Sequence, residues 1–460
     1  METDVIAANS ASAEHAAKLR GARGASYPSV PAGRSLHIAF LTPVPSEDGG
    51  ATGVATDVLV GLATLGHRID CFIAGYELAL PERLTSQSNL SFVWAKSRWR
   101  WDRWYSRTRL GAFLSGLLAR AWAFVRLRRE IVAKHERDAY DVIYQFSNIE
   151  TAGVPRSLLK TVPLVIHPET HIAGELRWFR RERHLARRCE PWHRRVLVEL
   201  MLITRTVIQR RSIGAATLVI CISEVFRDHL VADYKVPRER TRVIPNPVRL
   251  QRFQPAEKSA RQPPVLLVLG RISVRKGIDQ IIDLSHELVA RGIEARIRIV
   301  GAESLWSDYR PLLHGLHPAN AEYVGSVAPR EISDELKNCD VLVQASKYEP
   351  FGLTVAEALA AGVPVVATDE VGAAERVSRV VCAVVPADNA KRLTDAVQEM
   401  LVRLQADGGH TKEIARREAR RLFACADICR DISDALQQIV STSRTDVPPM
   451  TFAGFKAPIV

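Results

Sequence analysis

Apolar and polar residues follow a repeated order along this chain: a short apolar run, a turn-rich loop and an amphipathic helix. The run SLHIAFLTP (35–43) predicts a buried strand, VATDVLVGLATLG (54–66) predicts a helix, and HRIDCFIAG (67–75) predicts a second strand. Such a β-α-β unit implies a parallel sheet with a right-handed crossover. Further strand-like runs follow at 141–147, 161–167 and 216–223.

The same order begins again after a proline-rich stretch at 244–264. Two alternating β/α series separated by such a link indicate an α/β protein with two doubly wound parallel-sheet domains, at 35–248 and 262–425. Ligands of such domains bind at the C-terminal ends of the strands and often between domains. The apolar runs of the second series predict strands at 265–270, 295–301, 340–346 and 363–369.

The two ends of the chain differ from these domains. Residues 1–34 are rich in Ala, Ser, Gly and Pro and lack periodicity, which predicts a disordered leader. We expect residues 426–445 to form a C-terminal helix that returns to the first domain, and 446–460 to form a tail.

The segment EPFGLTVAE joins two carboxylates, Glu349 and Glu357, to the start of a helix. It follows the predicted strand at 340–346, and VAEALAAG (355–362) predicts a short helix after Gly352. A helix start offers unpaired N–H groups that suit a phosphate, whereas the carboxylates suit the neutral hydroxyls of a sugar. The pattern therefore predicts a site for a sugar joined to a phosphate.

The segment GRISVRKG (270–277) places Arg271 and Lys276 in a loop between a strand and a helix. Two fixed cations there can clamp a diphosphate and stabilise it as a leaving group. A solvated basic loop is the alternative. The chain contains no DxD pair, which favours a metal-independent site with the two cations in the electrostatic role of a metal.

Two further features of the first domain fall at predicted strand ends. The loop DGGATG (48–53) matches neither GxGxxG nor the phosphate-binding loop, so it is either a mobile loop over the ligand or an ordinary connection. His167 suits general acid/base work or hydrogen bonding to hydroxyls, with a structural hydrogen bond as the alternative. His171 is less favoured because it opens a basic helical segment.

The net charge of +12 is concentrated in two predicted basic helical insertions, near 97–137 and 172–212. The segment SRWRWDRWYSRTR (97–109) interleaves Trp and Arg, which suits an anionic membrane surface. A helix packed on its own domain is the alternative. Nucleic acid is not an expected partner, because no recognition motif accompanies the basic residues.

The seven cysteines are scattered and lack metal-ligand spacing. No N-terminal apolar segment and no apolar run of spanning length is present. These patterns predict a reduced, cytoplasmic protein, with peripheral attachment to the inner face of the plasma membrane as the alternative.

Taken together, the motifs resemble the retaining glycosyltransferases of family 4, whose GT-B architecture has two facing Rossmann-like domains. The resemblance spans roughly residues 36–435 and rests on the DGG loop, the VIPNP link, GRISVRKG and the E-x7-E spacing of Glu349 and Glu357. Two departures stand out. The link reads NPVR where the family commonly shows NGVD, and VGAAE replaces a GG-containing turn.

The resemblance implies a role for each charged candidate. Arg271 and Lys276 would bind the diphosphate of a nucleotide sugar, Glu349 the hydroxyls of its sugar, and Glu357 the ribose hydroxyls. His167 would lie near the transferred sugar and the acceptor. Further donor contacts are implied for backbone, loop and base-contacting positions: Gly49, Gly50, Val327, Phe351, Gly352 and Leu353.

The resemblance also implies an activity, which is transfer of a hexose from a nucleotide-diphosphate sugar to a lipid-linked or polysaccharide acceptor. The anomeric configuration would be retained without an enzymic nucleophile, a metal or another cofactor. Two alternatives stay open. One is a GT-B epimerase or hydrolase of sugar nucleotides, and the other is a non-catalytic protein that binds through its basic segments.

Overall fold

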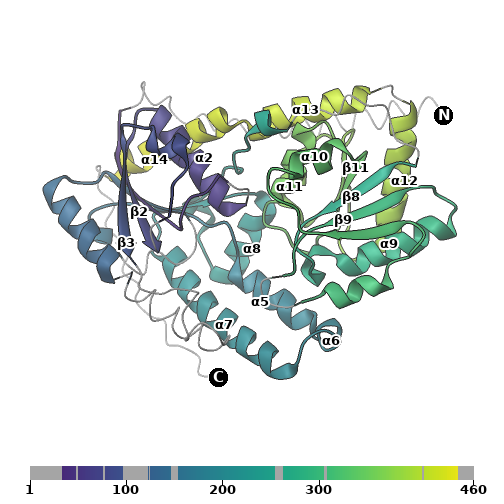
Figure 1. Ribbon diagram of the computed structural model, residues 1–460. Helices are drawn as coiled ribbons and strands as arrows, with labels where there is room; N and C mark the ends of the chain where they lie inside the picture. The colour runs from purple at the N-terminus through teal and green to yellow at the C-terminus, as the bar shows by residue number, and fades with distance from the viewer. Residues whose placement is uncertain are drawn as a thin grey trace. The chain divides into compact units, whose positions relative to one another are not determined.

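Two parallel β-sheets organise this protein (Figure 1). Gly49, the Trp/Arg segment 97–109, the predicted leader up to residue 33 and the tail lie outside the part of the chain that is described. The computed structural model describes residues 34–47, 50–75, 78–96, 123, 125–146, 154–253, 263–304, 308–406 and 409–443.

The first sheet has the strand order β3-β2-β1-β4-β5-β6-β7, and neighbouring strands pair in parallel. The order reverses between β1 and β4, which makes this the switch point of a doubly wound sheet. The strands are β1 (His37–Thr42), β2 (Arg68–Gly75), β3 (Leu90–Lys96), β4 (Val142–Phe146), β5 (Leu164–His167), β6 (Leu218–Cys221) and β7 (Thr241–Val243).

The second sheet repeats this topology in the order β10-β9-β8-β11-β12-β13, again with parallel pairs. Its switch point lies between β8 and β11. The strands are β8 (Val265–Leu269), β9 (Arg296–Val300), β10 (Ala321–Gly325), β11 (Val341–Gln344), β12 (Val365–Thr368) and β13 (Cys382–Val385). The structure thus has two doubly wound parallel sheets, as the sequence predicts.

Central strands of both sheets are buried throughout, because helices cover both faces of a parallel sheet. The first-half helices are α2 (Ala51–Thr64), α3 (Glu82–Thr85), α5 (Ile172–Arg181), α6 (Arg183–Ala186), α7 (Trp192–Gly214) and α8 (Glu224–Tyr234), and residues 125–137 are also helical. The second-half helices are α9 (Ile278–Ala290), α10 (Ile332–Lys337), α11 (Leu353–Ala360), α12 (Ala390–Ala406), α13 (His410–Phe423) and α14 (Cys425–Ser443).

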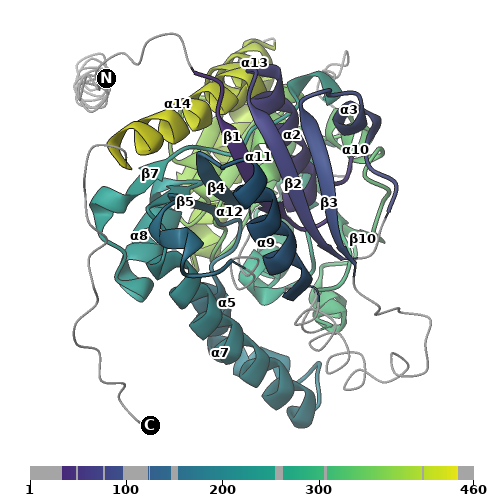
Figure 2. The same cartoon turned by 90° about the vertical axis from the view of Figure 1, so that its left-hand side faces the viewer.

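Helix α14 follows the second sheet in sequence but packs against the first (Figure 2). Its residues Ile432 and Leu436 share a buried cluster with Leu59 and Leu62 of α2. The Ser433 hydroxyl lies 2.7 Å from Nε2 of His67. The chain thus crosses back to its first half before the described residues end.

The structure corrects several sequence-based boundaries. Helices α2 and α11 begin at Ala51 and Leu353, before the starts at 54 and 355 that periodicity suggests. In α2, small or polar residues precede the apolar run, and α11 begins directly after its cap, Gly352. Four strands had no predicted counterpart: β3, β7, β10 and β13. In the described part of the chain, no helix combines the length and apolar character that crossing a bilayer requires.

Candidate functional site: the C-terminal edge of the second sheet

The switch point of the second sheet brings the predicted charged residues together. Strands β8 and β11 are neighbours, with Leu266 opposite Val341. Arg271 lies two residues beyond β8, and Lys276 ends a short 3-10 turn, η6 (Val274–Lys276). Glu349 follows β11 after five residues. Their convergence follows from the topology, because the C-terminal ends of adjacent parallel strands meet at one edge.

Lys276 and Glu349 form an ion pair, with the ammonium on Oε2 of the carboxylate. Arg275 is a second cation at this carboxylate, with Nη1 3.7 Å from Oε2 of Glu349. The same Nη1 donates a hydrogen bond of 2.7 Å to the carbonyl of Tyr348. Sequence reasoning missed Arg275, although its position beside Lys276 in the RK dipeptide was a signal.

The two partners perturb each other's protonation. Burial alone would raise the pKa of Glu349, but the charges of Lys276 and Arg275 outweigh it and hold that pKa below its ordinary value. Burial lowers the pKa of Lys276 despite the opposing influence of Glu349. The carboxylate is therefore ionised at neutral pH and ready to accept hydrogen bonds.

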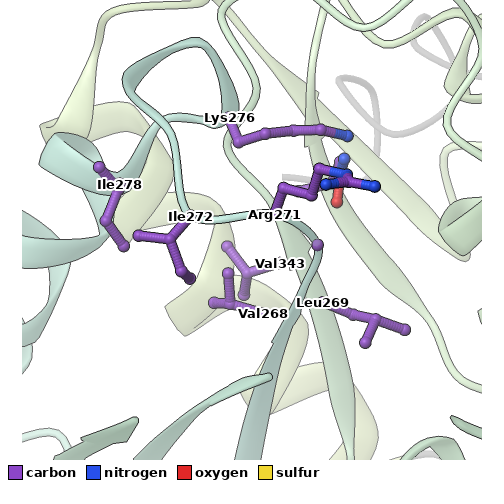
Figure 3. A pocket seen from close by; sticks show the side chains of 9 residues that line it. Val268, Leu269, Arg271, Ile272, Lys276, Ile278 and Val343 are labelled. Atoms are coloured by element: carbon purple, nitrogen blue, oxygen red, sulfur yellow. The ribbon is translucent and has the colours of Figure 1, made fainter. Parts of the chain in front are cut away.

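Arg271 is exposed and points the same way as Lys276 from the loop after β8 (Figure 3). Its Nη1 makes a long contact of 3.5 Å with the carbonyl of Glu303. Among the described residues, no carboxylate pairs with Arg271. An unneutralised guanidinium beside the partly buried ammonium of Lys276 is suited to an incoming phosphate.

A close backbone approach fixes this loop against β11. Gly277 has φ 76°, and a Cβ there would lie 1.8 Å from the carbonyl oxygen of Ala345. Only glycine fits at this point. The approach holds Lys276 near the end of β11, where Glu349 begins the next segment.

The start of α11 presents backbone N–H groups to the same edge. Gly352 caps the helix with φ 94°. The N–H groups of Phe351, Gly352 and Leu353 have no acceptor among the residues described here. The Phe351 ring is buried edge-on to Phe423, with centroids 5.8 Å apart, so this residue offers its backbone and not its side chain. Val327, beyond β10, is half-buried against the same core cluster.

Glu357 lines a cavity, with Gly50 at the start of α2 and with Asp57, Arg249 and Arg252. Burial raises the pKa of Glu357 to about 7, against the lowering influence of Arg252. Its carboxylate makes no hydrogen bond within the described part of the chain. The glycine-rich loop and Glu357 therefore face one cavity, although they lie about 300 residues apart in sequence.

Arg249, one of the two residues that depart from the family link, has a clear structural role. Its Nη1 lies 2.7 Å from Oε2 of Glu47, in the loop before α2. Its Nε lies 3.2 Å from Oδ1 of the buried Asp57, which also binds Arg83. The NPVR sequence therefore ties the link between the halves to the glycine-rich loop. Sequence reasoning missed this network because its partners are distant along the chain.

His167 ends β5 in a fully buried polar cluster. Its Nδ1 lies 2.7 Å from the Tyr144 hydroxyl, and its Nε2 lies 3.4 Å from Oε1 of Glu169. Oε2 of Glu169 accepts a hydrogen bond of 2.7 Å from Asn246, in the link. Neither Nε2 of His167 nor Oε1 of Glu169 has a hydrogen-bond partner among the described residues.

Burial controls protonation in this cluster. It lowers the pKa of His167 to about 3 and raises the pKa of Glu169 to about 8. Both groups are therefore uncharged near neutral pH. No direct hydrogen bond or ion pair among the described residues joins His167 to Lys276 or Glu349. Sequence reasoning found His167 but not Glu169 or Asn246.

Tyr348 connects the C-terminal edge of the second sheet to the first half of the chain. Its hydroxyl lies 2.8 Å from Nδ1 of His171, the residue that precedes α5. The Ser223 hydroxyl donates a hydrogen bond of 2.7 Å to the carbonyl of Pro350. These contacts brace both neighbours of Glu349, and His171 has a positioning role that the sequence did not reveal.

Family comparisons agree with this geometry. A model described as Glycosyltransferase Family 4 matches residues 48–252, and one described as Glycosyl transferases group 1 matches residues 251–406. The chain belongs to glycosyltransferase family 4. The first model covers the glycine-rich loop and His167. The second covers the C-terminal edge of the second sheet with Arg271, Arg275, Lys276 and Glu349, which we call the donor edge.

Two curated relatives each match about a third of this family 4 chain. Mannosylfructose-phosphate synthase of Agrobacterium fabrum is 32% identical over 33% of this chain and 37% of its own. Alpha-monoglucosyldiacylglycerol synthase of Streptococcus pneumoniae is 32% identical over 32% of this chain and 36% of its own. The chain thus matches little more than a third of either relative's length.

Solved structures show the GT-B fold over a larger share of the chain. Sucrose-phosphate synthase from Thermosynechococcus elongatus has a TM-score of 0.66 at 19% identity and covers 89% of this chain and 100% of its own. HepE from Anabaena, solved in complex with UDP and glucose, has a TM-score of 0.56 at 19% identity and covers 88% and 100%. At these identities the likeness establishes the fold.

Proposed function

We propose that this protein is a retaining glycosyltransferase that takes a hexose from a nucleotide-diphosphate sugar. The observation that carries the proposal is the partly buried Lys276–Glu349 pair beside the unneutralised Arg271, at the switch point of the second sheet. Sheets of this class bind ligands there. Relatives named as synthases of sugar phosphates and glycolipids, and HepE bound to UDP-glucose, support this class of donor.

Arg271 and Lys276 would act on the leaving group. When the bond from the sugar to the diphosphate breaks, negative charge increases on the diphosphate oxygens, and nearby fixed cations stabilise it most at that moment. The free N–H groups at the start of α11 add donors for the same phosphates. This arrangement supplies the charge stabilisation that a metal would otherwise give, so we propose transfer without a metal.

The two glutamates would hold hydroxyls. Glu349 is ionised and fixed by Lys276 and Arg275, so it can accept hydrogen bonds from the transferred sugar. Glu357 lies farther along α11 in the cavity with Gly50, where it would accept from the ribose. Val327, Phe351, Gly352 and Leu353 would complete the donor contacts, together with Gly49 beside Gly50.

His167 would contact the acceptor or the transferred sugar through Nε2, which makes no hydrogen bond among the described residues. Since the imidazole is neutral near pH 7, it offers a hydrogen bond to a hydroxyl without adding charge. The proposed retention needs no enzymic nucleophile: the acceptor hydroxyl attacks from the face that the diphosphate leaves, and a phosphate oxygen accepts its proton.

The acceptor that we propose is lipid-linked or a polysaccharide precursor, used on the cytoplasmic side of a membrane. Two relatives carry lipid substrates in their names, alpha-monoglucosyldiacylglycerol synthase and phosphatidylinositol N-acetylglucosaminyltransferase of Saccharomyces cerevisiae. The local basic charge of this chain is consistent with an anionic surface.

A panel of nucleotide sugars tests the donor. A ligand that binds only the folded protein raises its melting temperature, so one sugar and one base should stabilise the protein more than the rest of the panel. Transfer from that donor into membrane extract, with and without EDTA, then tests the acceptor class and metal independence. Stabilisation by no member of the panel would overturn the proposal, and hydrolysis or epimerisation without transfer would replace it with another reaction.

A further inference from the structure

One face of helix α7 exposes a continuous apolar stripe. Trp192 is 76% exposed and Leu200 is 58% exposed. The spacing of three or four residues keeps the stripe within an arc of about 80° over a length of about 22 Å. Exposed apolar patches of this extent mark interaction surfaces. The stripe consists of Trp192, Val196, Leu200, Ile203 and Val207.

The opposite face of α7 is already packed. Leu202 is buried in a small cluster with Ile172 and Phe179 of α5. Gln209 accepts hydrogen bonds from the Ile172 N–H at 2.9 Å and from the Tyr234 hydroxyl at 2.5 Å. Figures 1 and 2 both show α7 on the outer side of α5. The helix is therefore firmly seated with its apolar stripe facing outward.

An arginine-lined cavity of about 440 Å³ adjoins the C-terminal end of the stripe. Helices α5, α7 and the end of α8 form its walls. Its one acidic lining residue, Asp233, is bound by the guanidinium of Arg177 at 2.5 Å. Four arginines line the cavity: Arg177, Arg180, Arg181 and Arg210.

The cavity keeps a positive charge after its internal pairing. Arg180 binds Glu199 at 2.8 Å, and Arg181 lies over the Trp178 ring at 5.1 Å. Arg210 has no ion-pair partner within the described residues and lies one turn after Val207 of the stripe. A guanidinium fork matches a phosphate group well, so an apolar surface and a phosphate site lie side by side.

The charge around the stripe decides which occupant it suits. Exposed arginines flank both of its ends, with Arg187 and Arg188 before the helix and Arg210 and Arg211 at its close. A second copy of the chain would bring the same cations against them. Nucleic acid would leave the apolar stripe uncovered. An anionic bilayer satisfies both parts, with acyl chains for the stripe and phosphates for the arginines.

We propose that α7 lies in the surface of an anionic phospholipid bilayer, with one lipid phosphate in the arginine-lined cavity. The stripe would enter the headgroup region, with Trp192 at the depth that suits its amphipathic ring. Helix α5 leads from this surface to His171, which contacts Tyr348 beside Glu349. This membrane surface would bring a membrane-borne acceptor to the donor edge, and only that step rests on the proposed function.

Flotation with lipid vesicles tests this surface without any donor or acceptor. The full chain should bind vesicles containing phosphatidylglycerol more strongly than vesicles of phosphatidylcholine alone, and salt should weaken the binding. Leu200→Gln should lower the partition constant by about fivefold, because an inserted apolar side chain is lost. Val402→Gln is its matched control, since Val402 is 60% exposed on α12.

Arg210→Gln tests the cavity. It should weaken binding to the anionic vesicles by about fivefold and leave binding to neutral vesicles unchanged. The control is Arg420→Gln, an exposed arginine of α13. Melting temperatures of all four variants show whether each one folds.

Three results would overturn the proposal: wild-type binding that ignores lipid charge, Leu200→Gln variants that bind like the wild type, or equal losses in the two controls. A change of oligomeric state in Leu200→Gln, without a change in vesicle binding, would assign the stripe to self-association instead. Stabilisation of the wild type by nucleotide sugars, measured without vesicles, tests the proposed transferase independently.

Discussion

A polar cluster lies at the C-terminal edge of each sheet, and the two clusters differ in protonation. One contains a charged pair, and the other contains uncharged groups. At the second sheet, Lys276 and Glu349 form an ion pair with Arg271 beside it. At the first sheet, burial keeps His167 and Glu169 uncharged near neutral pH, with pKa values of about 3 and about 8. Under the proposed function, the charged cluster would receive an anionic leaving group and the uncharged cluster a neutral hydroxyl.

This difference has a physical origin. Parallel strands place loops of both halves at comparable edges, and the loop after β8 brings two cations, Lys276 and Arg275, to the carboxylate of Glu349. The carboxylate of Glu169 receives a hydrogen bond from Asn246 instead of a full positive charge, which is too weak to offset burial. Glu349, which has charged partners, is therefore ionised, whereas Glu169, which has a neutral partner, keeps its proton.

The largest effect should come from removing the charge of the donor edge. Lys276→Ala leaves Glu349 with Arg275 alone and takes one cation from the leaving group. We expect transfer to fall by about a thousandfold, measured as turnover of the donor found in the panel. Lys391→Ala, on the exposed surface of α12, is the control. Near wild-type turnover of Lys276→Ala would remove the donor edge from the reaction.

A smaller effect should follow from the protonation of Glu357. Its pKa of about 7 means that the carboxylate form becomes dominant as pH rises from 6 to 8. If ribose hydroxyls need that form, nucleotide affinity should rise by about tenfold over this range. Calorimetric titration at the two pH values measures it. Glu357→Gln should flatten the profile, and an equally steep profile in that variant would assign the dependence to another group.

The neutral cluster gives a stability effect with a definite sign. The folded pKa of Glu169 is raised, so its contribution to stability is complete below pH 4.5 and declines as pH rises through about 8. Glu169→Gln removes that ionisation. We expect the wild type to lose a few degrees more of melting temperature than the variant between pH 6 and pH 9. Parallel curves for the two proteins would show that Glu169 does not hold its proton.

Glu399→Gln, an exposed change on α12, is the control for that measurement.

His167 affects stability in the opposite direction, at lower pH. Because its folded pKa is depressed to about 3, its contribution to stability is present above pH 6.5 and is lost as pH falls toward 3. The cluster as a whole should therefore stabilise the folded state most between about pH 4.5 and pH 6.5.

The smallest effect concerns the link between the two halves. Arg249→Ala removes the contacts to Glu47 and Asp57, but Arg83 still pairs with Asp57. Since this pair is partly exposed, the free energy of unfolding should fall by about 1 kcal/mol. Urea denaturation measures it, with Arg420→Ala as the control. A loss of several kcal/mol would mean that the link carries much more of the stability than its contacts suggest.

Sequence reasoning recovered the parts of the fold that consist of continuous apolar runs. VLLVLG and DVLVQAS became β8 and β11, the two central strands that create the donor edge. It missed β10 and β7, because the first alternates half-buried with exposed residues and the second has only three residues. Strand signals depend on burial on both faces, which edge strands lack.

In the candidate site too, residues with a local sequence motif were predicted, and residues whose partners are distant in sequence were missed. Lys276 and Glu349 have local motifs, and the topology brings them into contact. Arg249 and Asn246 lie within the proline-rich link, where the sequence signal indicates a turn and nothing about partners. Their roles depend on Glu47 and Glu169, which are distant in sequence and come close only through the fold.

The return of α14 to the first sheet has a consequence for synthesis of the chain. Leu59 and Leu62 of α2 obtain part of their cover from Ile432 and Leu436, residues that are synthesised after the whole of the second sheet. The first half therefore cannot close its core as an independent unit while translation proceeds. A premature stop between the second sheet and Cys425 would expose apolar surface on α2, so a nonsense mutation there should yield an aggregating product and not a shortened enzyme.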